Sequence, residues 1–424
     1  ATRRRRASCA APSPGCRGAS RRRYAAALVR LVVGIPTRNR PDLAAAAIAS
    51  AARTSDPRLA LVVSDNSTDP DASERVRRLC DEHAGVTYLR PPEALSMPEH
   101  WEWLARRIRE VAEPTHLAYL SDRMVFRAGG LAALLAVAER HPGRVVSFPF
   151  DRVEDWAAPV ALVQTEWSGR LVELDARRVI ELASGGVLYA EHLPRMLNSV
   201  APVETLDAIA ARYGDVFAST TSPDYGFAFR ALAVGDTLLY LDRPCVIQYA
   251  FHSSNGFTFL RGVRNDASSD FERRLARPVN VTTPEPRLRT FANAMFEEYC
   301  LASEQGGGDR FPPLDRRRYL AENAESARWM TEPLRGQTEE LLRQAGWTRA
   351  ARARHALRER LERRRHRARH PREEDGAPDR RPRFADAAAA IAHADAHPRP
   401  PAPRAWHVET LERNGAVLRA LPAP

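Results

Sequence analysis

The chain has 424 residues, of which 44% are hydrophobic and 28% are charged, a composition typical of folded globular proteins and unlike that of disordered or collagen-like chains. All 64 basic residues are arginines, which excludes chemistry that needs a lysine, such as a Walker A phosphate loop or a Schiff base. The net charge of +11 comes from residues 1–30 and 347–372, so the rest of the chain is net acidic and a nucleic-acid-binding protein is not predicted.

Cysteine usage and hydrophobicity indicate the compartment. The five cysteines are far apart and form no Cys-x-x-Cys pair, so neither a disulfide framework nor a zinc ribbon is predicted, and a reducing cytoplasm is expected. No run approaches the roughly 18 consecutive apolar residues of a transmembrane helix. The apolar stretch after the first arginines is short and is interrupted by Arg30, so a secretory signal is not expected.

From residue 31 onward, short apolar runs alternate with helical patterns. This alternation predicts an α/β fold with a mostly parallel sheet and helices on both faces. The predicted strands are Leu31–Pro36, Leu59–Asp65, Val86–Arg90, His116–Ser121 and Arg144–Phe150. The predicted helices between them are Asp42–Arg53, Ala72–His83, Pro98–Val111 and Ala128–His141.

After residue 150 the pattern becomes mixed. Residues Val160–Leu174 are expected to form a hairpin around Ser168 and Gly169. Further helices are predicted at Ala176–Leu182 and Val203–Tyr213, and strands that extend the first sheet at Thr237–Leu241 and Val246–Tyr249. Helical periodicity then dominates in Arg287–Ser303, Arg316–Met330 and Glu332–Ala345. Residues 346–372 are a candidate Arg-rich helix, and residues 373–404 are predicted to be linker or disordered.

These changes in pattern predict a four-part organisation. Residues 1–30 form a basic, disordered tail, and residues 31–265 form the α/β domain with a nucleotide-binding half (31–150) and an acceptor half (151–265). A helical extension follows at 266–345, and residues 346–424 combine the Arg-rich helix with a Pro- and Ala-rich, partly disordered tail.

Three predicted strands end in polar residues. In an open parallel sheet, ligands bind beyond the carboxyl ends of the strands, so these residues are candidates for a binding site. They occur in the segments Ile35-Pro36-Thr37-Arg38-Asn39-Arg40, Asp65-Asn66-Ser67-Thr68-Asp69 and Leu120-Ser121-Asp122-Arg123.

In these segments the sequence resembles the family 2 glycosyltransferases of GT-A fold. That family transfers a sugar, with inversion, from a nucleotide diphosphate donor, and its strands end in Ile-Pro-Thr-x-Asn-Arg, Asp-Asn-x-Ser-x-Asp and Leu-x-Asp-Asp-Asp. The first two patterns match closely and the third in part, over roughly residues 31–260. The resemblance implies a hexosyltransferase-type enzyme of bacterial polysaccharide biosynthesis.

The resemblance also assigns roles on the donor side. Asp65 would accept hydrogen bonds from a base such as uracil, and Asn66 and Ser121 belong to the same nucleotide-sugar-binding set. Pro36, Thr37 and Arg38 would line the nucleotide pocket, with Arg38 or Arg40 near the phosphates. From the residues alone, an alternative stays open in which residues 65–69 only form an Asx turn that caps the next helix.

The third motif implies a metal ion. Asp122 matches the first carboxylate that holds Mn²⁺ or Mg²⁺ against the donor diphosphate, and His252 is a further candidate metal ligand. Arg123 and Met124 replace the other two acids of the motif. One hypothesis is that Arg123 supplies the positive charge instead and contacts the diphosphate directly, and the rival is that Asp122 holds a water-rich metal.

The second half of the chain should supply the general base. Asp224 resembles the acidic residue at the start of a helix in the family, followed six residues later by Arg230, and would take the proton of the acceptor hydroxyl. Its alternative role is that of a helix N-cap. Trp101, Trp103, Trp156 and Trp167 are candidates for stacking on sugar rings.

The predicted function is an inverting glycosyltransferase that uses a nucleotide-sugar donor, with UDP-sugars favoured, and a glycan, lipid-linked or small-molecule acceptor. The alternative is a catalytically silent nucleotide-sugar-binding or scaffolding protein with a degenerate metal motif. The arginine-rich ends suggest contact with an anionic membrane surface, or are solvated tails. They lack the interleaved aromatic residues of a single-strand nucleic-acid groove, so no nucleic-acid partner is predicted.

Overall fold

The structure of the chain is a computed structural model, and it describes residues 29–188, 190–263, 265–274, 282–369 and 381–423. The predicted basic tail therefore lies almost entirely outside the described residues. None of the helices in the described ranges is both long enough and apolar enough to cross a membrane.

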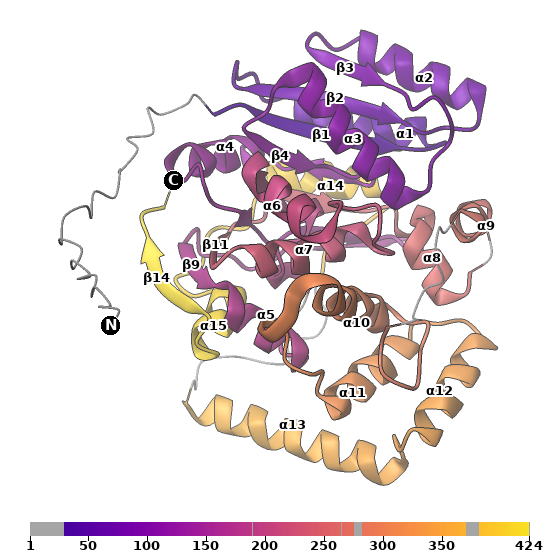
Figure 1. The fold of residues 1–424 in the computed structure, drawn as a ribbon, viewed down its shortest axis with the longest axis vertical. Helices are drawn as coiled ribbons and strands as arrows, with labels where there is room; N and C mark the ends of the chain where they lie inside the picture. The colour runs from indigo at the N-terminus through magenta and orange to yellow at the C-terminus, as the bar shows by residue number, and fades with distance from the viewer. Residues whose placement is uncertain (1–28, 189, 264, 275–281, 370–380, 424) are drawn as a thin grey trace, which may run out of the picture.

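A nine-stranded sheet forms the centre of the molecule (Figure 1). Its strands, in spatial order, are β14 (Val417–Leu421), β9 (Leu171–Asp175), β11 (Thr237–Leu241), β6 (Val146–Ser147), β10 (Ser199–Pro202), β4 (His116–Tyr119), β1 (Leu31–Thr37), β2 (Leu59–Asp65) and β3 (Val86–Leu89). The pairings make seven of these strands run in one direction, whereas β9 and β10 run in the other. The predicted α/β fold with a mostly parallel sheet is confirmed.

The middle of this sheet is buried on both faces. All seven residues of β1 are buried, as expected for a central parallel strand that reads as a continuous apolar run. Gly34 in β1 leaves room for the ring of Tyr119, since a Cβ atom at Gly34 would lie 2.9 Å from the Tyr119 Cε1 atom. The close approach fixes β4 beside β1, and with it the loop that follows β4.

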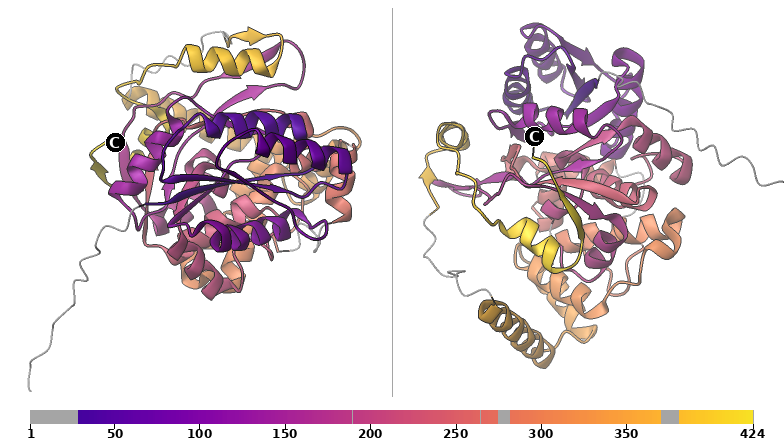
Figure 2. Two further views of the ribbon diagram at one scale, coloured as in Figure 1. Left: turned by 90° about the horizontal axis from the view of Figure 1, so that it is seen from above. Right: turned by 90° about the vertical axis from the view of Figure 1, so that its left-hand side faces the viewer.

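Helices cover both faces of the sheet. On one face α1 (Pro41–Ala52) packs against β1 and against α2 (Pro70–Asp81). On the other face α3 (Met97–Ala112) packs against β1, β2 and α7 (Pro223–Val234), and α7 also contacts α5 (Ala176–Ser184) and α6 (Val203–Tyr213). Figure 2 shows the indigo α1 and α2 on the opposite side of the sheet from the purple α3. A further helix, α4 (Gly130–Arg140), precedes β6.

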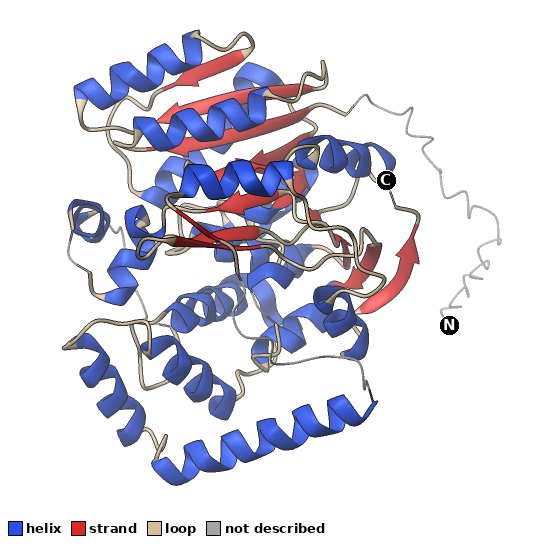
Figure 3. Ribbon diagram, turned by 180° about the vertical axis from the view of Figure 1, so that it is seen from behind, coloured by secondary structure: helices blue, strands red, loops and turns tan. Residues whose placement is uncertain are grey.

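A second, five-stranded sheet lies over the α1 side. Its strand order is β13 (Arg383–Phe384), β8 (Val160–Val163), β7 (Asp151–Glu154), β12 (Val246–Gln248) and β5 (Met124–Phe126). The helix α14 (Ala387–Ala396) packs on this sheet together with Leu43 and Ala46 of α1, and Figure 3 shows this layer from behind.

Three expectations fail in this region. The hairpin predicted at Val160–Leu174 is wrong, because β8 and β9 pair in different sheets. Residues Val246–Tyr249 do not extend the first sheet, because β12 pairs with β5 and β7. The linker predicted at 373–404 is wrong over 383–396, where Ala390 and Ala394 are buried in a core shared with β8. The sequence pattern missed this helix because a run of alanines looks like a low-complexity segment and gives no sign of the surface that it packs against.

Helices dominate after β12. They are α8 (Asn255–Arg261), α9 (Asp266–Arg273), α10 (Phe291–Ala302), α11 (Arg316–Ala327), α12 (Leu334–Gln344), α13 (Arg349–Arg369) and α15 (Trp406–Arg413). Short 3-10 turns occur at Ala190–His192, Met196–Asn198, Phe251–Ser253 and Gly308–Arg310, and a π turn at Ser303–Gly307. The predicted helical character after residue 287 is confirmed, and α13 covers 349–369 of the range predicted for the Arg-rich helix, of which 370–372 lie outside the described residues.

Candidate active site

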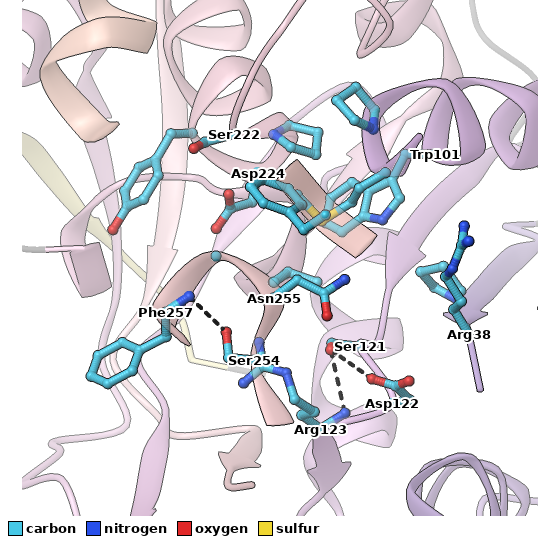
Figure 4. A pocket seen from close by; sticks show the side chains of 18 of the residues that line it. Arg38, Trp101, Ser121, Asp122, Arg123, Ser222, Asp224, Ser254, Asn255 and Phe257 are labelled. Carbon is cyan, nitrogen blue, oxygen red and sulfur yellow. Dashed lines mark hydrogen bonds between the residues drawn. The ribbon is translucent and has the colours of Figure 1, made fainter. Parts of the chain in front are cut away.

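A cavity of about 380 Å³ opens where β1 and β4 end, in the size range of small-molecule sites. Its lining comes from the loops after β1, β2 and β4 and from α7, α8 and α9, and Figure 4 shows part of it. Most of the residues singled out from the sequence line it: Pro36, Thr37, Arg38, Arg40, Asn66, Ser121, Asp122, Arg123 and Asp224. The sequence-predicted site therefore converges on one cavity, with two exceptions.

Asn39 and Asn66 tie the strand-end loops together. Asn39 has a left-handed backbone (φ 52°), and its side-chain oxygen accepts hydrogen bonds from the backbone N–H groups of Thr68 (2.8 Å) and Asp69 (3.1 Å). The Asn66 amide pairs in both directions with the backbone of Leu95, at 2.9 Å each. These contacts hold the backbone of the loops after β1 and β2 in place, through the exposed amide of Asn39 and the buried amide of Asn66.

The Asp122 carboxylate is buried and already has protein partners. Its side chain is 1% exposed, and Oδ2 accepts a hydrogen bond from the Thr37 hydroxyl at 2.9 Å. The same oxygen lies 3.0 Å from Nε of Arg40, which also donates to the Ser253 carbonyl oxygen at 2.8 Å. The carboxylate thus holds an arginine at the end of β1.

Arg123 follows Asp122 and has a hydrogen-bond donor without a partner in the described part of the chain. Its Nη1 atom is buried and has no hydrogen-bond partner among the described residues. Burial, together with the nearby charge of Arg40, lowers the pKa of Arg123 to about 10, so the guanidinium is still charged at neutral pH. A buried, charged and unpaired donor is costly, and an anionic group would satisfy it.

The charge of the cavity favours an anion. Six arginines line it, against four carboxylates, within the described part of the chain. The arginines are Arg38, Arg40, Arg123, Arg152, Arg195 and Arg274, and the acids are Asp122, Glu191, Asp224 and Asp270. His100 adds no charge, because burial lowers its pKa to about 3.

Arg38 is held by the helix α9. Its guanidinium lies against both carboxylate oxygens of Asp270 on α9, at 2.9 and 3.2 Å, and donates to the Leu95 carbonyl oxygen at 3.0 Å. Arg274 contacts the same carboxylate at 3.0 Å. Asp270 therefore fastens α9 to the rim of the cavity.

Asp224 faces the strand-end residues from the opposite wall. It lies in the first turn of α7, and Ser222, not Asp224, is the N-cap residue of that helix. One of its oxygens accepts a hydrogen bond from Arg195 at 3.2 Å, and its side chain is 18% exposed. Figure 4 shows the carboxylate at the cavity, above Asn255 and Arg123. The position of Asp224 leaves it free of a capping bond and open to a ligand.

A buried acid shapes the loop in front of Asp224. Glu298 on α10 accepts hydrogen bonds from the backbone N–H groups of Thr221 (2.7 Å) and Ser222 (2.6 Å). Burial raises the pKa of Glu298 to about 7. Arg230, by contrast, lies in the core, where it binds Asp215 at 2.9 Å and does not line the cavity.

Asp65 and His252 are the two exceptions. Asp65 is fully buried, does not line the cavity, and accepts hydrogen bonds from Ser67 N (2.9 Å), Ser73 Oγ (2.5 Å) and Tyr88 OH (3.0 Å). This is the Asx-turn arrangement. His252 also lies outside the lining, with a side chain 68% exposed and its Nδ1 3.7 Å from Asp155.

The residues present do not fit the divalent metal that the motif implies. A hard cation takes several oxygen ligands, yet Asp122 is neutralised by Arg40 and the next residue is Arg123. In the described ranges, no three His, Cys, Asp or Glu side chains come together as a metal cluster. Positive charge at this strand end comes from guanidinium groups.

Arg152, Glu191 and Arg195 line the cavity but were not found from the sequence. Arg195 precedes a 3-10 turn, and its guanidinium lies over the rings of Phe150 and Tyr225 at 5.1 and 5.3 Å. No motif marks these three positions. In a chain with 64 arginines, a single arginine in a loop carries no signal.

No protein-family model matches the chain, and no curated protein sequence matches it. Among solved structures it is similar to S. aureus TarS 1-349, at 12% identity and a TM-score of 0.41, covering 72% of this chain and 82% of the other. It is also similar to S. aureus TarS, at 13% identity and a TM-score of 0.39, covering 72% and 50%. A third similar structure is S. aureus TarS 1-349 in complex with UDP-GlcNAc, at 12% identity and a TM-score of 0.40, covering 72% of this chain and 83% of the other. Roles for individual residues therefore rest on the geometry of the cavity.

Proposed function

We propose that this protein is a glycosyltransferase that binds a nucleotide diphosphate sugar in the cavity and transfers the sugar to a hydroxyl acceptor. The observation that carries the proposal is the meeting, in one cavity, of an arginine-rich strand end and a carboxylate on the opposite wall. For the reaction, the sequence motifs favour inversion, as in family 2. For the donor, they favour a uridine nucleotide.

The arginines would bind the diphosphate. Arg123 has a buried, unpaired Nη1 atom, and Arg40 lies beside it at the end of β1. Guanidinium groups contact phosphate oxygens in a bidentate manner, and charge-assisted hydrogen bonds of this kind are about twice as strong as neutral ones. As the sugar leaves the phosphate, these groups would stabilise the negative charge that develops on the diphosphate.

Asp224 would act as the general base. The acceptor oxygen forms a bond to the anomeric carbon, its proton moves to the Asp224 carboxylate, and the bond from that carbon to the diphosphate breaks with its electron pair. Attack on the face opposite the diphosphate inverts the configuration. Arg195, 3.2 Å from Asp224, would hold the carboxylate in position before the transfer.

No step of this mechanism uses a metal ion. The role that Mn²⁺ or Mg²⁺ would have, neutralising the diphosphate, is assigned to Arg123 because Asp122 is occupied by Arg40 and Thr37. His252 is given no role, since it lies outside the cavity lining.

A thermal-shift screen tests the proposal. Purified protein is heated with UDP, GDP, ADP and their sugar derivatives, each with Mn²⁺ or with EDTA. Because a ligand that binds only the folded state raises Tm as its concentration exceeds its Kd, one nucleotide should stabilise the protein in both conditions. Stabilisation by none of the nucleotides would overturn the donor assignment.

One observation favours the alternative of a silent nucleotide-sugar-binding protein: the two cavity carboxylates that the sequence motifs single out, Asp122 and Asp224, are already paired with arginines. The two functions differ in one measurement. A transferase hydrolyses its donor slowly in the absence of an acceptor, because water can replace the acceptor hydroxyl, whereas a silent protein binds the donor and returns it intact.

The proposal includes contact between the helix α13 and an anionic membrane surface on the cytoplasmic side. The helix α13 carries Leu357 and Leu361 on one face, with side chains 58% and 43% exposed. Arg354, Arg358 and Arg360 are exposed beside them. Two exposed leucines flanked by arginines suit the interface between lipid headgroups and acyl chains.

A further inference from the structure

A small pocket of about 320 Å³ is lined by residues of the helices α11 and α13 and of the turn that follows α12 (Figure 1). Its volume is at the lower end of the range for small-molecule sites. None of the described residues that line it also lines the cavity that contains Asp224. The pocket is therefore a separate site, and what it binds does not depend on the transferase proposal.

Four arginines line this pocket, and no acid does among the residues that the structure describes. Arg316 and Arg317 begin α11, whereas Arg354 and Arg358 lie one helical turn apart on one face of α13. The nearest acid in the sequence, Asp315, caps α11 and does not line the pocket. Because like charges that share a small space repel one another, an anion in the pocket would stabilise this arrangement.

The indole of Trp347 gives an independent indication of a ligand. Trp347 lines the pocket and is 7% exposed, and its Nε1 atom is buried without a hydrogen-bond partner in the described part of the chain. An indole N–H is a donor only, and a buried donor that stays unpaired is costly. A ligand with acceptor oxygens would satisfy the indole and the arginines together.

Packing around Trp347 joins the elements that form the pocket. Trp347 belongs to a buried apolar cluster that includes Leu320 of α11 and Leu342 of α12. Its ring meets the ring of His355 on α13 edge-on, with centroids 5.5 Å apart. Arg317 Nη2 lies 3.3 Å from Nδ1 of the same histidine. The two helices and the turn are thus held in contact, and the lining is preformed.

We propose that this pocket binds a phosphate group. A phosphate monoester carries about −1.5 to −2 charges at neutral pH and three acceptor oxygens, whereas a carboxylate carries one charge and two oxygens. Guanidinium groups contact phosphate in a bidentate manner, so one phosphate can accept from arginines of both helices and from the Trp347 N–H. Nucleic acid is not favoured, because the buried Trp347 ring is not available to stack on a base. The phosphate belongs either to a soluble molecule or to a lipid headgroup.

Isothermal titration of the full chain tests the assignment, with pyrophosphate as the soluble ligand and dihexanoylphosphatidic acid as the lipid headgroup. Pyrophosphate should occupy two independent sites, the donor cavity and this pocket. Arg354→Gln with Arg358→Gln should weaken the pocket site at least tenfold and leave the other site unchanged. Trp347→Phe should also weaken the pocket site, because it keeps an aromatic ring and removes the N–H. The matched control is Arg352→Gln with Arg360→Gln, which removes the same charge from exposed positions of α13 outside the pocket.

Arg123→Gln separates this inference from the proposed function, because it should remove only the pyrophosphate site of the donor cavity. A single site that Arg123→Gln removes and the pocket variants leave intact would overturn the phosphate pocket, provided that phosphatidic acid does not bind there either. A single site that only the pocket variants remove would support the pocket and contradict the donor site. Phosphatidic acid bound at the pocket without pyrophosphate would support the inference and assign the phosphate to a lipid. Equal weakening by the control pair would show a general effect of charge and overturn the inference.

Discussion

Arg40 and Asp122 form an ion pair at the carboxyl end of β1, with 3.0 Å between Arg40 Nε and Asp122 Oδ2. The pair uses the carboxylate that the sequence motif assigns to a metal ion. It also places a guanidinium beside Arg123, whose Nη1 atom lacks a partner among the described residues. The carboxylate expected to bind a metal cation therefore holds Arg40 in place, in a wall of the cavity whose arginines suit an anion.

Nucleotide diphosphate binding should therefore depend on Arg123 and not on a metal. Arg123→Gln is expected to weaken binding by about 10-fold or more, since a hydrogen bond to a charged group contributes about 1.5–3 kcal/mol. EDTA should leave the wild-type Kd unchanged. The control is Arg144→Gln, an ion-paired arginine outside the cavity. Loss of binding in EDTA with recovery in Mn²⁺ would contradict this prediction.

Asp224→Asn should abolish transfer while preserving donor binding. General base catalysis contributes about 10²- to 10⁴-fold, and asparagine keeps the shape but cannot take the proton. The expected result is a loss of kcat of that order with an unchanged nucleotide-sugar Kd. Asp236→Asn serves as the control, because Asp236 is 88% exposed and outside the cavity. Undiminished turnover in Asp224→Asn would remove this residue from the mechanism.

Asp65→Ala distinguishes a structural role from recognition of the base. The carboxylate accepts hydrogen bonds from Ser67, Ser73 and Tyr88, so its removal leaves buried donors unpaired, at a cost of about 1–3 kcal/mol each. Tm should fall by several degrees, while the Kd for the nucleotide measured well below Tm should change little. An unchanged Tm with lost nucleotide affinity would instead support direct contact between Asp65 and the base.

Glu298 should make stability depend on pH. The folded chain holds its proton up to about pH 7, whereas the unfolded chain releases it near 4.5. The folded state therefore binds more protons between these values, and the free energy of unfolding should fall as pH rises through that window, by up to roughly 3 kcal/mol. In Glu298→Gln this pH-dependent fall in the free energy of unfolding should be absent, as measured by urea unfolding at pH 5, 6, 7 and 8.

The matched control for Glu298 is Glu304→Gln, an exposed position shortly after the same helix. It should keep the wild-type pH dependence, because an exposed carboxylate loses little hydration on folding. Identical slopes for wild type and Glu298→Gln would show that Glu298 is ionised throughout the range.

The helix α13 should bind anionic vesicles. Flotation with vesicles that contain phosphatidylglycerol should recover the protein, and phosphatidylcholine alone should not. Arg354→Glu with Arg358→Glu should weaken recovery strongly, since each basic residue near the surface contributes about 1 kcal/mol. Leu357→Ser with Leu361→Ser should also reduce recovery.

Leu341→Ser is the matched control for the leucine variant, because Leu341 is 41% exposed on the neighbouring helix α12. Equal recovery with both kinds of vesicle, or with neither, would contradict membrane contact through α13. If the protein bound DNA under the same salt conditions but did not bind vesicles, the arginines of α13 would be assigned to nucleic-acid binding instead.

Periodicity predicted most helices and strands because it is a local property. The continuous apolar run of β1 and the amphipathic pattern of α3 need no knowledge of their partners. The alanines of α14 carry no such pattern, so their burial against β8 was missed. The same limit explains the wrong hairpin: two strands adjacent in sequence were assumed to pair, yet β8 and β9 lie in different sheets.

The sequence by itself determined the α/β class and the chemistry at the strand ends, because Thr37 and Asp122 directly follow the apolar runs that predict the strands, whatever surrounds them. Only the tertiary structure decided that Asp122 pairs with Arg40, that Asp65 is turned inward, and that Arg195 meets Asp224. It also brought together the rings of Trp156, Phe257 and Phe291. Such contacts join residues far apart in the chain, and their geometry depends on the path of the whole backbone, which local pattern does not encode.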